Sequence, residues 1–293
     1  MDALQSVNLS PLMARTRGNP AIKVGLIDGP VFLEHPDLDG RQIQEMPSHY
    51  NSACLRPSSA ACAHGTLVAG VLSARRGSAA PAICPLCTLL VRPIFPEASG
   101  MESDQPSARP AELGMAIEEV VRAGARVLNL SAAISQPSSR GESQLEEALN
   151  FAACRNVLVV AAAGNQGTLG SSSITRHQAV IPVVACDLQG WPTEESNLGK
   201  SIGQRGLRAP GRFITSLATD GTTREFEGTS AAAPIVSGTI ALLWSEFPEA
   251  TALEIKAAVL HSARGSRSAI VPPLLDAWGA YESLARQREY AMA

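Results

Sequence analysis

Four polar residues along this chain are of the types that together can cleave a carbonyl compound: Asp28, His64, Asn165 and Ser230. A serine hydroxyl is a weak nucleophile and needs a neighbouring base, whereas an imidazole base needs a carboxylate that fixes its tautomer. An asparagine amide can donate a hydrogen bond to the oxyanion of the tetrahedral intermediate. The set therefore predicts nucleophilic catalysis, with Asp28, His64 and Ser230 as a triad and Asn165 as the oxyanion donor.

Each of these residues also has a purely structural explanation when taken alone. Asp28 and Gly29 form a common turn dipeptide, and Ser230 suits the N-cap of a helix. A histidine such as His64 that opens a buried helix is more often structural than catalytic. The catalytic interpretation depends on all four residues occurring together.

The stretch around Ser230 predicts the start of a buried helix, because residues 235–244 are almost entirely apolar. The partial positive charge at a helix N-terminus stabilises negative charge that develops beside a serine oxygen there. We expect Pro234 in the first turn, where the missing N–H of a proline costs little.

Apolar runs bounded by turn residues predict the elements that position these side chains. Five runs read as buried strands: 21–27, 87–94, 126–131, 157–163 and 179–186. Helices are expected at 67–74, 111–123, 144–155, 235–244, 252–262 and 274–287, whereas 96–110 reads as a surface loop and 187–228 as short strands and turns. This alternating order predicts an α/β fold, in which a mostly parallel sheet has helices on both faces.

The length, composition and net charge of the chain limit the class of protein. With 293 residues, 45% of them hydrophobic, and a net charge of -3, the chain has ample material for a core and no electrostatic reason to bind nucleic acid or an acidic membrane. No run is long enough to span a membrane, and residues 1–20 lack the apolar centre of a signal peptide. We expect a cytoplasmic protein, or a secreted one if the chain is a processed form.

The six cysteines leave several states open. Cys154 and Cys186 lie in apolar surroundings and are expected to be buried thiols. The other four, in loop-like stretches, suit free thiols, one or two disulfides, or a zinc site: Cys54, Cys62, Cys84 and Cys87.

Four segments resemble the motifs of the subtilisin-like serine proteases. They are VGLIDG at 24–29, HGTLVAG at 64–70, AGN at 163–165 and GTSAAAP at 228–234, and the resemblance covers residues 20–265. It implies a three-layer subtilisin-like fold and a serine endopeptidase that forms an acyl-enzyme. The implied organisation is a lead at 1–20, a peptidase domain at 21–265, and a C-terminal helical extension at 266–293 packed on that domain.

Within this family, the chain is most similar to the proteases that mature cyanobactins, small ribosomal peptides that are trimmed and cyclised. Residues 61–66, 84–95 and 158–165 carry this similarity. It implies that the substrate is a precursor peptide, cut to remove its leader. The macrocyclising members carry a helical insertion between the Asp and His motifs, and residues 29–63 show no helical hairpin, so we expect hydrolysis.

The resemblance also implies a substrate pocket for the residue before the cut. Its expected lining is Leu130, Ser131, Ala132, Ala133, Ala162, Ala163, Gly164 and Thr229. Thr229 is expected either close to the oxyanion or as a helix cap. The family's Ser-Leu-Gly strand reads Ser-Ala-Ala here, which still permits strand addition by a peptide but changes the pocket floor.

No cofactor is expected, and calcium is possible but not indicated, because the insertion that forms a strong calcium site in secreted relatives is missing after His64. Only 27 residues precede Asp28, and they include no signal peptide, so we expect either a processed form or a chain that folds unaided inside the cell. Met1 favours the second alternative, which suits a dedicated processing enzyme better than a degradative one. Three other functions stay open: a general degradative protease, a peptide macrocyclase, and a catalytically silent peptide-binding scaffold. The oligomeric state is also open.

Overall fold

The computed structural model describes residues 2–97, 107–131, 133–134 and 141–292. At its centre is a seven-stranded sheet with the strand order β2-β3-β1-β5-β7-β8-β9, and every neighbouring pair in it is parallel. The bounds of its strands are β1 Lys23–Asp28, β2 Ile43–Glu45, β3 Thr88–Pro93, β5 Val127–Leu130, β7 Leu158–Ala162, β8 Val180–Cys186 and β9 Leu207–Pro210. The five predicted strands are all present, so the predicted parallel α/β sheet is confirmed.

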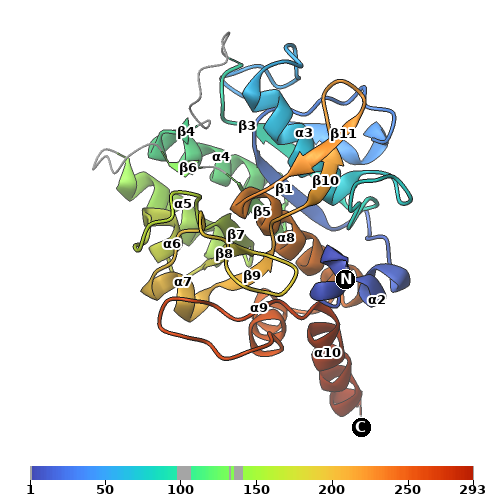
Figure 1. Ribbon diagram of the computed structural model, residues 1–293, viewed down its shortest axis with the longest axis vertical. Helices are drawn as coiled ribbons and strands as arrows, with labels where there is room; N and C mark the ends of the chain where they lie inside the picture. The colour runs from blue at the N-terminus through green and yellow to red at the C-terminus, as the bar shows by residue number, and fades with distance from the viewer. Residues whose placement is uncertain (1, 98–106, 132, 135–140, 293) are drawn as a thin grey trace.

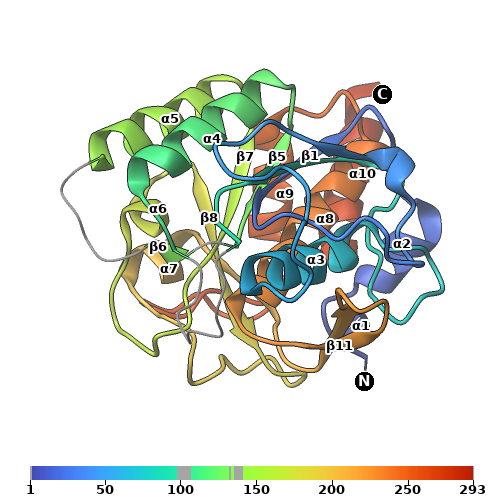
Figure 2. The same ribbon diagram turned by 90° about the horizontal axis from the view of Figure 1, so that it is seen from above.

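Helices cover both faces of this sheet (Figures 1 and 2). On one face lie α4 Pro110–Arg122 and α5 Glu142–Cys154; on the other lie α3 Ala60–Ser73, α8 Thr229–Glu246, α9 Ala252–His261 and α10 Ala277–Met292. Successive side chains of a strand point to opposite faces of the sheet. In β1, Leu26 packs in the core between the sheet and α8, and Ile27 packs in the core between the sheet and α4. The central strands are therefore buried on both sides.

Smaller elements complete the described fold. They are the short helices α1 Ala3–Ser6, α2 Leu9–Arg15, α6 Ser173–Arg176 and α7 Lys200–Arg205, the 3-10 turn η1 Gly40–Gln42, the parallel pair β4 Ser107–Ala108 and β6 Ala133–Ile134, and the antiparallel hairpin β10 Ile214–Leu217 and β11 Thr223–Phe226. Among the described residues, no helix has both the length and the apolar character needed to cross a membrane.

Several details differ from the sequence-based expectations. Residues 187–228, expected to be short strands and turns, also contain a helix, α7, and one of their strands, β9, extends the main sheet. The helix that carries His64 begins at Ala60, with Ser59 as its N-cap, so the histidine lies inside the helix instead of opening it.

Pro234 is the sixth residue of α8 and lies beyond the first turn. The Ser230 carbonyl therefore lacks the N–H donor that any other residue type at this position would offer it.

The last helix begins at Ala277, and its buried residues Ala280 and Leu284 join the core of the α8 layer.

The cysteines fall into three groups. Cys54 and Cys62 form a disulfide. Cys84, Cys87 and Cys186 are buried free thiols, whereas Cys154 is exposed at the end of α5. The expectation of a buried Cys154 was therefore wrong, because Ala152 lies on the buried face of α5 whereas Ala153 and Cys154 are exposed.

Candidate active site

The predicted site residues gather where the parallel strands end. Asp28 is the last residue of β1, Leu130 ends β5, and Ala162 ends β7. Open α/β sheets bind ligands at this edge, because the connections that leave the carboxyl ends of the strands surround a common crevice. Helix α8 begins at the same edge, with Ser230 as its second residue.

Asp28 and His64 are joined by a hydrogen bond of 2.6 Å between Oδ1 and Nδ1. The carboxylate is fully buried, and its Oδ1 also accepts the N–H of Gly29 at 2.6 Å. Its buried Oδ2 has no hydrogen-bond partner among the described residues. The imidazole, with 23% of its side chain exposed, is therefore the main partner that can balance the carboxylate charge.

Two glycines allow this pair to form. A Cβ on Gly65 of α3 would lie 2.4 Å from the carbonyl oxygen of Gly29, and a Cβ on Gly29 would lie 1.9 Å from that of Ala61. Both distances are far below van der Waals contact, so any side chain at either position would push α3 away from β1. Close helix–strand approach is what brings the His64 ring within reach of Asp28.

Burial alone lowers the pKa of His64, but the charge of Asp28 and its hydrogen bond raise it by more. The net effect is a pKa above the ordinary value of a histidine. Because Nδ1 faces the carboxylate, it carries the hydrogen in the neutral ring, and Nε2 is left as the basic nitrogen. Among the described residues, none forms a hydrogen bond with Nε2.

Ser230 is 8% exposed, and its hydroxyl donates to the carbonyl of Ser131 at 3.2 Å rather than to His64. The ring of Phe226, two residues before Gly228, meets the His64 ring edge-on with centroids 5.6 Å apart. Among the described residues, no hydrogen bond joins the Ser230 hydroxyl to the imidazole. Such hydrogen bonds often tighten only once a substrate is bound.

A buried polar chain holds Ser131 in place. Ser237 in α8 donates to Oδ1 of Asn129 at 2.9 Å, and the Asn129 amide donates to the Ser131 hydroxyl at 2.8 Å. The chain links the nucleophile helix to the end of β5, and each of its members is buried.

The expected oxyanion residue, Asn165, is held by the start of α8. Both the N–H and the hydroxyl of Thr229 donate to Asn165 Oδ1, each at 2.9 Å. Thr229 is the first residue of α8 and not its cap, since the N-cap is Gly228. A Cβ on Gly228, whose φ is +93°, would lie 2.9 Å from the Asn165 amide nitrogen. Glycine there leaves room for the asparagine.

The remaining predicted pocket residues lie along two strand ends. Leu130, Ser131 and Ala163 are buried, and the N–H of Gly164 donates to the Thr229 hydroxyl at 3.2 Å. Ala133 belongs to β6, and Ala132 lies outside the described residues. The structure thus brings the 130–131 and 162–164 segments to the same edge as Ser230.

Asn197, which no sequence motif indicates, organises the loop after β7. Its Oδ1 accepts the N–H groups of Gln166 and Thr168, and its amide donates to the Ala163 carbonyl at 3.2 Å. Loop asparagines commonly satisfy nearby backbone groups, but nothing local in the sequence indicates a partner thirty residues away.

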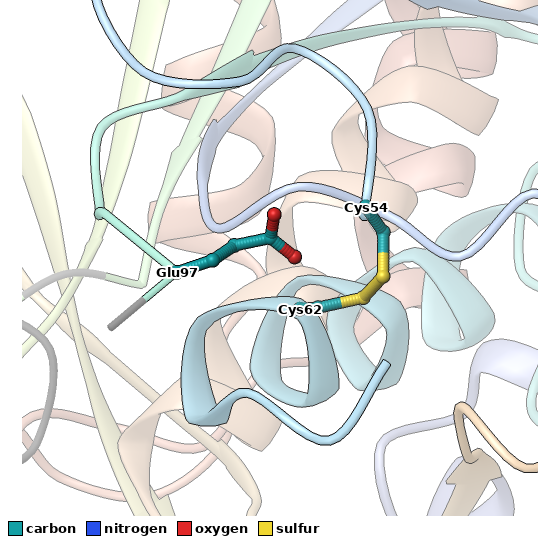
Figure 3. A group of neighbouring side chains, drawn as sticks. All are labelled: Cys54, Cys62 and Glu97. Atoms are coloured by element: carbon teal, nitrogen blue, oxygen red, sulfur yellow. A yellow bond between two sulfur atoms is a disulfide. The ribbon is translucent and has the colours of Figure 1, made fainter. Parts of the chain in front are cut away.

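A disulfide joins Cys54 to Cys62 (Figure 3). Cys62 lies two residues before His64 in α3, so the disulfide is beside the site. Glu97 lies next to it and accepts the N–H groups of Leu55 and Arg56 at 3.1 and 2.9 Å. The two sulfurs and this carboxylate are close enough to surround a metal ion, but the sulfurs are bonded to one another. This group of residues ties the 54–59 loop to α3.

Comparison with known proteins identifies relatives of the whole fold. Residues 19–285 match the subtilase family. The thermophilic serine proteinase of Bacillus sp. (strain AK1) is 32% identical over 237 residues, which are 79% of this chain and 54% of that protein. Subtilisin amylosacchariticus of Bacillus subtilis subsp. amylosacchariticus is 29% identical over 238 residues, covering 80% and 58%. The chain spans little more than half the length of these curated relatives.

Two solved structures are similar over nearly the whole chain. The protease domain of PatA superposes with a TM-score of 0.84 at 32% identity, covering 92% of this chain and 97% of that one. The prenylagaramide maturation protease PagA gives a TM-score of 0.82 at 31% identity, covering 94% and 98%. The chain belongs to the subtilase family of serine proteases.

Proposed function

We propose that this subtilase is an endopeptidase in which Ser230 is the nucleophile, His64 the general base and Asp28 the residue that orients it. His64 Nε2 takes the hydroxyl proton as Ser230 Oγ attacks the scissile carbonyl, and the buried Asp28 carboxylate stabilises the resulting imidazolium. The imidazolium then gives its proton to the leaving amine. Water, deprotonated by the same nitrogen, releases the acyl group from Ser230.

The observation that carries this proposal is the 2.6 Å hydrogen bond between His64 Nδ1 and Asp28 Oδ1. It fixes the tautomer in which the free Nε2 is the base, and it supplies the charge that a transient imidazolium requires. Both are properties of a general base rather than of a histidine that only packs.

We propose Asn165 as the main oxyanion donor. Its Oδ1 is occupied by Thr229, so Nδ2 is the atom left to donate. The N–H of Ser230 offers a second donor at the start of α8, because first-turn N–H groups have no partner within a helix. A helix N-terminus also favours the negative charge of the intermediate.

For the substrate, we propose a ribosomal precursor peptide from which a leader is removed. Two maturation proteases, PatA and PagA, are 31–32% identical and covered over more than nine-tenths of their chains, which supports a processing role. Residues 29–59 form only η1 and β2 besides turns, and this supports open access of water to the acyl-enzyme. Hydrolysis to linear products is therefore the favoured outcome over cyclisation.

A fluorophosphonate probe read by intact mass tests the nucleophile. We expect a single adduct on the wild-type protein and none on Ser230→Ala. Absence of an adduct on well-folded wild type would contradict the catalytic proposal and favour a peptide-binding scaffold.

Product analysis tests the substrate class. We expect selective cuts in a synthetic peptide library, linear product masses, and slow cleavage of unfolded casein. Rapid, unselective digestion of casein would favour a degradative protease, and products that have lost one water would favour a cyclase.

A further inference from the structure

A cavity of about 260 Å³ opens beside the proposed oxyanion donor. Its lining includes Asn165, Glu195, Gly211, Arg212, Glu227 and Gly228. This group, called the acidic pocket below, is smaller than the cavities of 300 Å³ or more that typically hold drug-sized ligands. Its size therefore suits one amino-acid side chain of a bound peptide.

The acidic pocket adjoins the proposed oxyanion donor, Asn165, and is separate from the expected pocket for the residue before the cut. It contains none of the residues expected to hold the side chain before the cut, which lie at 130–133 and 162–164. Asn165 marks the position of the scissile carbonyl oxygen, and Gly228 lies two residues before Ser230. A peptide that passes Ser230 and leaves the 130–133 segment behind therefore enters the acidic pocket with the residues that follow the cut.

The charges in the acidic pocket do not cancel. Arg212 pairs with Glu195, with 3.2 Å between Nη2 and Oε1. Glu227 is exposed at the end of β11, and no cationic side chain among the described residues forms an ion pair with it. One carboxylate is therefore left over. Gly211 and Gly228 contribute no side chains, so a long substrate side chain can approach that carboxylate.

The sign of this charge decides the class of side chain. An acidic substrate residue would have to displace Glu195 from Arg212 and would then lie close to the uncompensated Glu227. A lysine or arginine pairs with Glu227 directly and leaves the Glu195–Arg212 pair intact. Attraction between solvent-exposed charges is modest and is weakened by salt.

Resting on the proposed function, we infer that the acidic pocket makes Glu227 a specificity-determining residue, which favours lysine or arginine at the first or second position after the cut. We expect kcat/KM for lysine to exceed that for glutamine by about 2- to 5-fold, the range for a solvent-exposed ion pair. Glutamate at the same position is expected to be the poorest of the three.

The test uses fluorogenic peptides that share one sequence, chosen from cuts that the wild-type protein makes in a peptide library. They differ only in Lys, Gln or Glu at the two positions after the cut. Wild type, Glu227→Gln and Glu225→Gln are compared, because Glu225 lies on the same hairpin and is exposed but does not line the pocket. We expect the lysine preference to vanish in Glu227→Gln, to persist in Glu225→Gln, and to shrink in about 0.5 M NaCl.

Equal rates for Lys and Gln peptides with the wild type, or an unchanged preference in Glu227→Gln, would overturn the inference about the pocket alone. In that case the fluorophosphonate adduct on Ser230 still forms, and the proposed function stands. Folded wild type that neither forms the adduct nor cuts any peptide would overturn both.

Discussion

Thr229 holds the side chain of Asn165 through two hydrogen bonds to a single atom. Its N–H and its hydroxyl both donate to Oδ1 at 2.9 Å, and the hydroxyl in turn accepts the N–H of Gly164 at 3.2 Å. The amide is therefore fixed with Oδ1 toward α8, and Nδ2 has no hydrogen-bond partner in the part of the chain that the structure describes. Preorganised donors of this kind stabilise charge without reorganising during the reaction.

Loss of the Asn165 Nδ2 donor is expected to lower kcat more than it changes KM. Removing one oxyanion donor costs about 10²- to 10³-fold in kcat, so we expect a fall of that order for Asn165→Ala. Thr229→Val keeps the backbone bond and loses only the hydroxyl, and we expect a fall of roughly 5- to 10-fold. Steady-state kinetics on a fluorogenic peptide measure both constants.

Thr229→Ser is the matched control, because it retains the hydroxyl. We expect nearly wild-type kcat from it. A loss equal to that of Thr229→Val, or a change confined to KM, would show that the threonine acts through packing and not by orienting Asn165.

The pH dependence of activity is expected to follow His64. The base must be neutral, and Asp28 holds the pKa of His64 above its ordinary value of about 6.5 despite the opposing effect of burial. Activity therefore falls as the pH drops through a midpoint above 6.5, and Asp28→Asn is expected to move this midpoint down while lowering kcat steeply. The profile of kcat/KM against pH reports the value in the free enzyme.

The same shift affects stability with the opposite dependence on pH. The pKa of His64 is higher in the folded protein than in the unfolded chain, where it is about 6.5. The contribution of the Asp28–His64 pair to the free energy of unfolding is therefore complete below pH 6.5, and it is lost as the pH rises through the pKa of the folded state. For the pH profile of activity, His261→Gln is the control, because this exposed histidine lies on α9 and outside the proposed site. We expect it to leave the profile unchanged. An acid limb that Asp28→Asn leaves in place would argue against His64 as the titrating base.

The main sheet could be predicted because its strands are continuous apolar runs, and two-sided burial of a parallel sheet requires such runs. The run at 179–186 differs from β8 by one residue. The 187–228 region was harder to predict, because α7 has six residues with a glycine inside it and β9 contains a charged arginine. Both depend on packing partners distant in sequence.

The same distinction applies to the site. Asp28, His64 and Ser230 each lie in a short motif that resembles one of the subtilisin-like proteases, so the sequence alone indicates them. The direction of the Ser230 hydroxyl is a rotamer choice that no motif encodes. The acidic pocket is likewise invisible in the sequence, since Glu195, Arg212 and Glu227 come from separate loops.

Reduction of the Cys54–Cys62 disulfide is expected to lower stability. The bridge closes a loop with a sequence separation of 8, and the loop-entropy relation gives about 2.6 kcal/mol for such a loop. We expect the double variant Cys54→Ser/Cys62→Ser to lose about this much free energy of unfolding in urea. Because the bridge anchors α3 just before His64, activity is expected to fall at temperatures where the loop opens.

Cys154→Ser is the matched control, because it removes an exposed thiol that forms no bridge. Its unfolding curve is expected to match the wild type. If a dithiol reductant lowers the urea midpoint of unfolding of the wild type but not that of the double variant, the loss of stability comes from the Cys54–Cys62 bridge. An equal shift in both would assign it elsewhere.

Arg76 ties the N-terminal helices to the loop before β3. Its guanidinium donates to four backbone carbonyls, those of Ala82, Met13, Thr16 and Ile83, at distances from 2.5 to 3.2 Å. No neutral side chain of this size offers as many donors, and the planar fork loses little freedom in binding them. The arginine therefore acts as a fixed internal cation that joins two chain segments.

Replacing Arg76 is expected to lower the stability of the protein, because the guanidinium joins the N-terminal segment to the loop before β3. Arg76→Met keeps much of the apolar stem and leaves the carbonyls without donors, so we expect the free energy of unfolding to fall by about 3 kcal/mol. Arg76→Lys should recover only part of that loss, because one ammonium group cannot reach four carbonyls on two separate segments. Arg75→Met, at the exposed neighbouring position, is the control and is expected to be neutral in the same urea titration. Equal stability of the Arg75 and Arg76 variants would show that the four contacts contribute nothing net, because water replaces the guanidinium without cost.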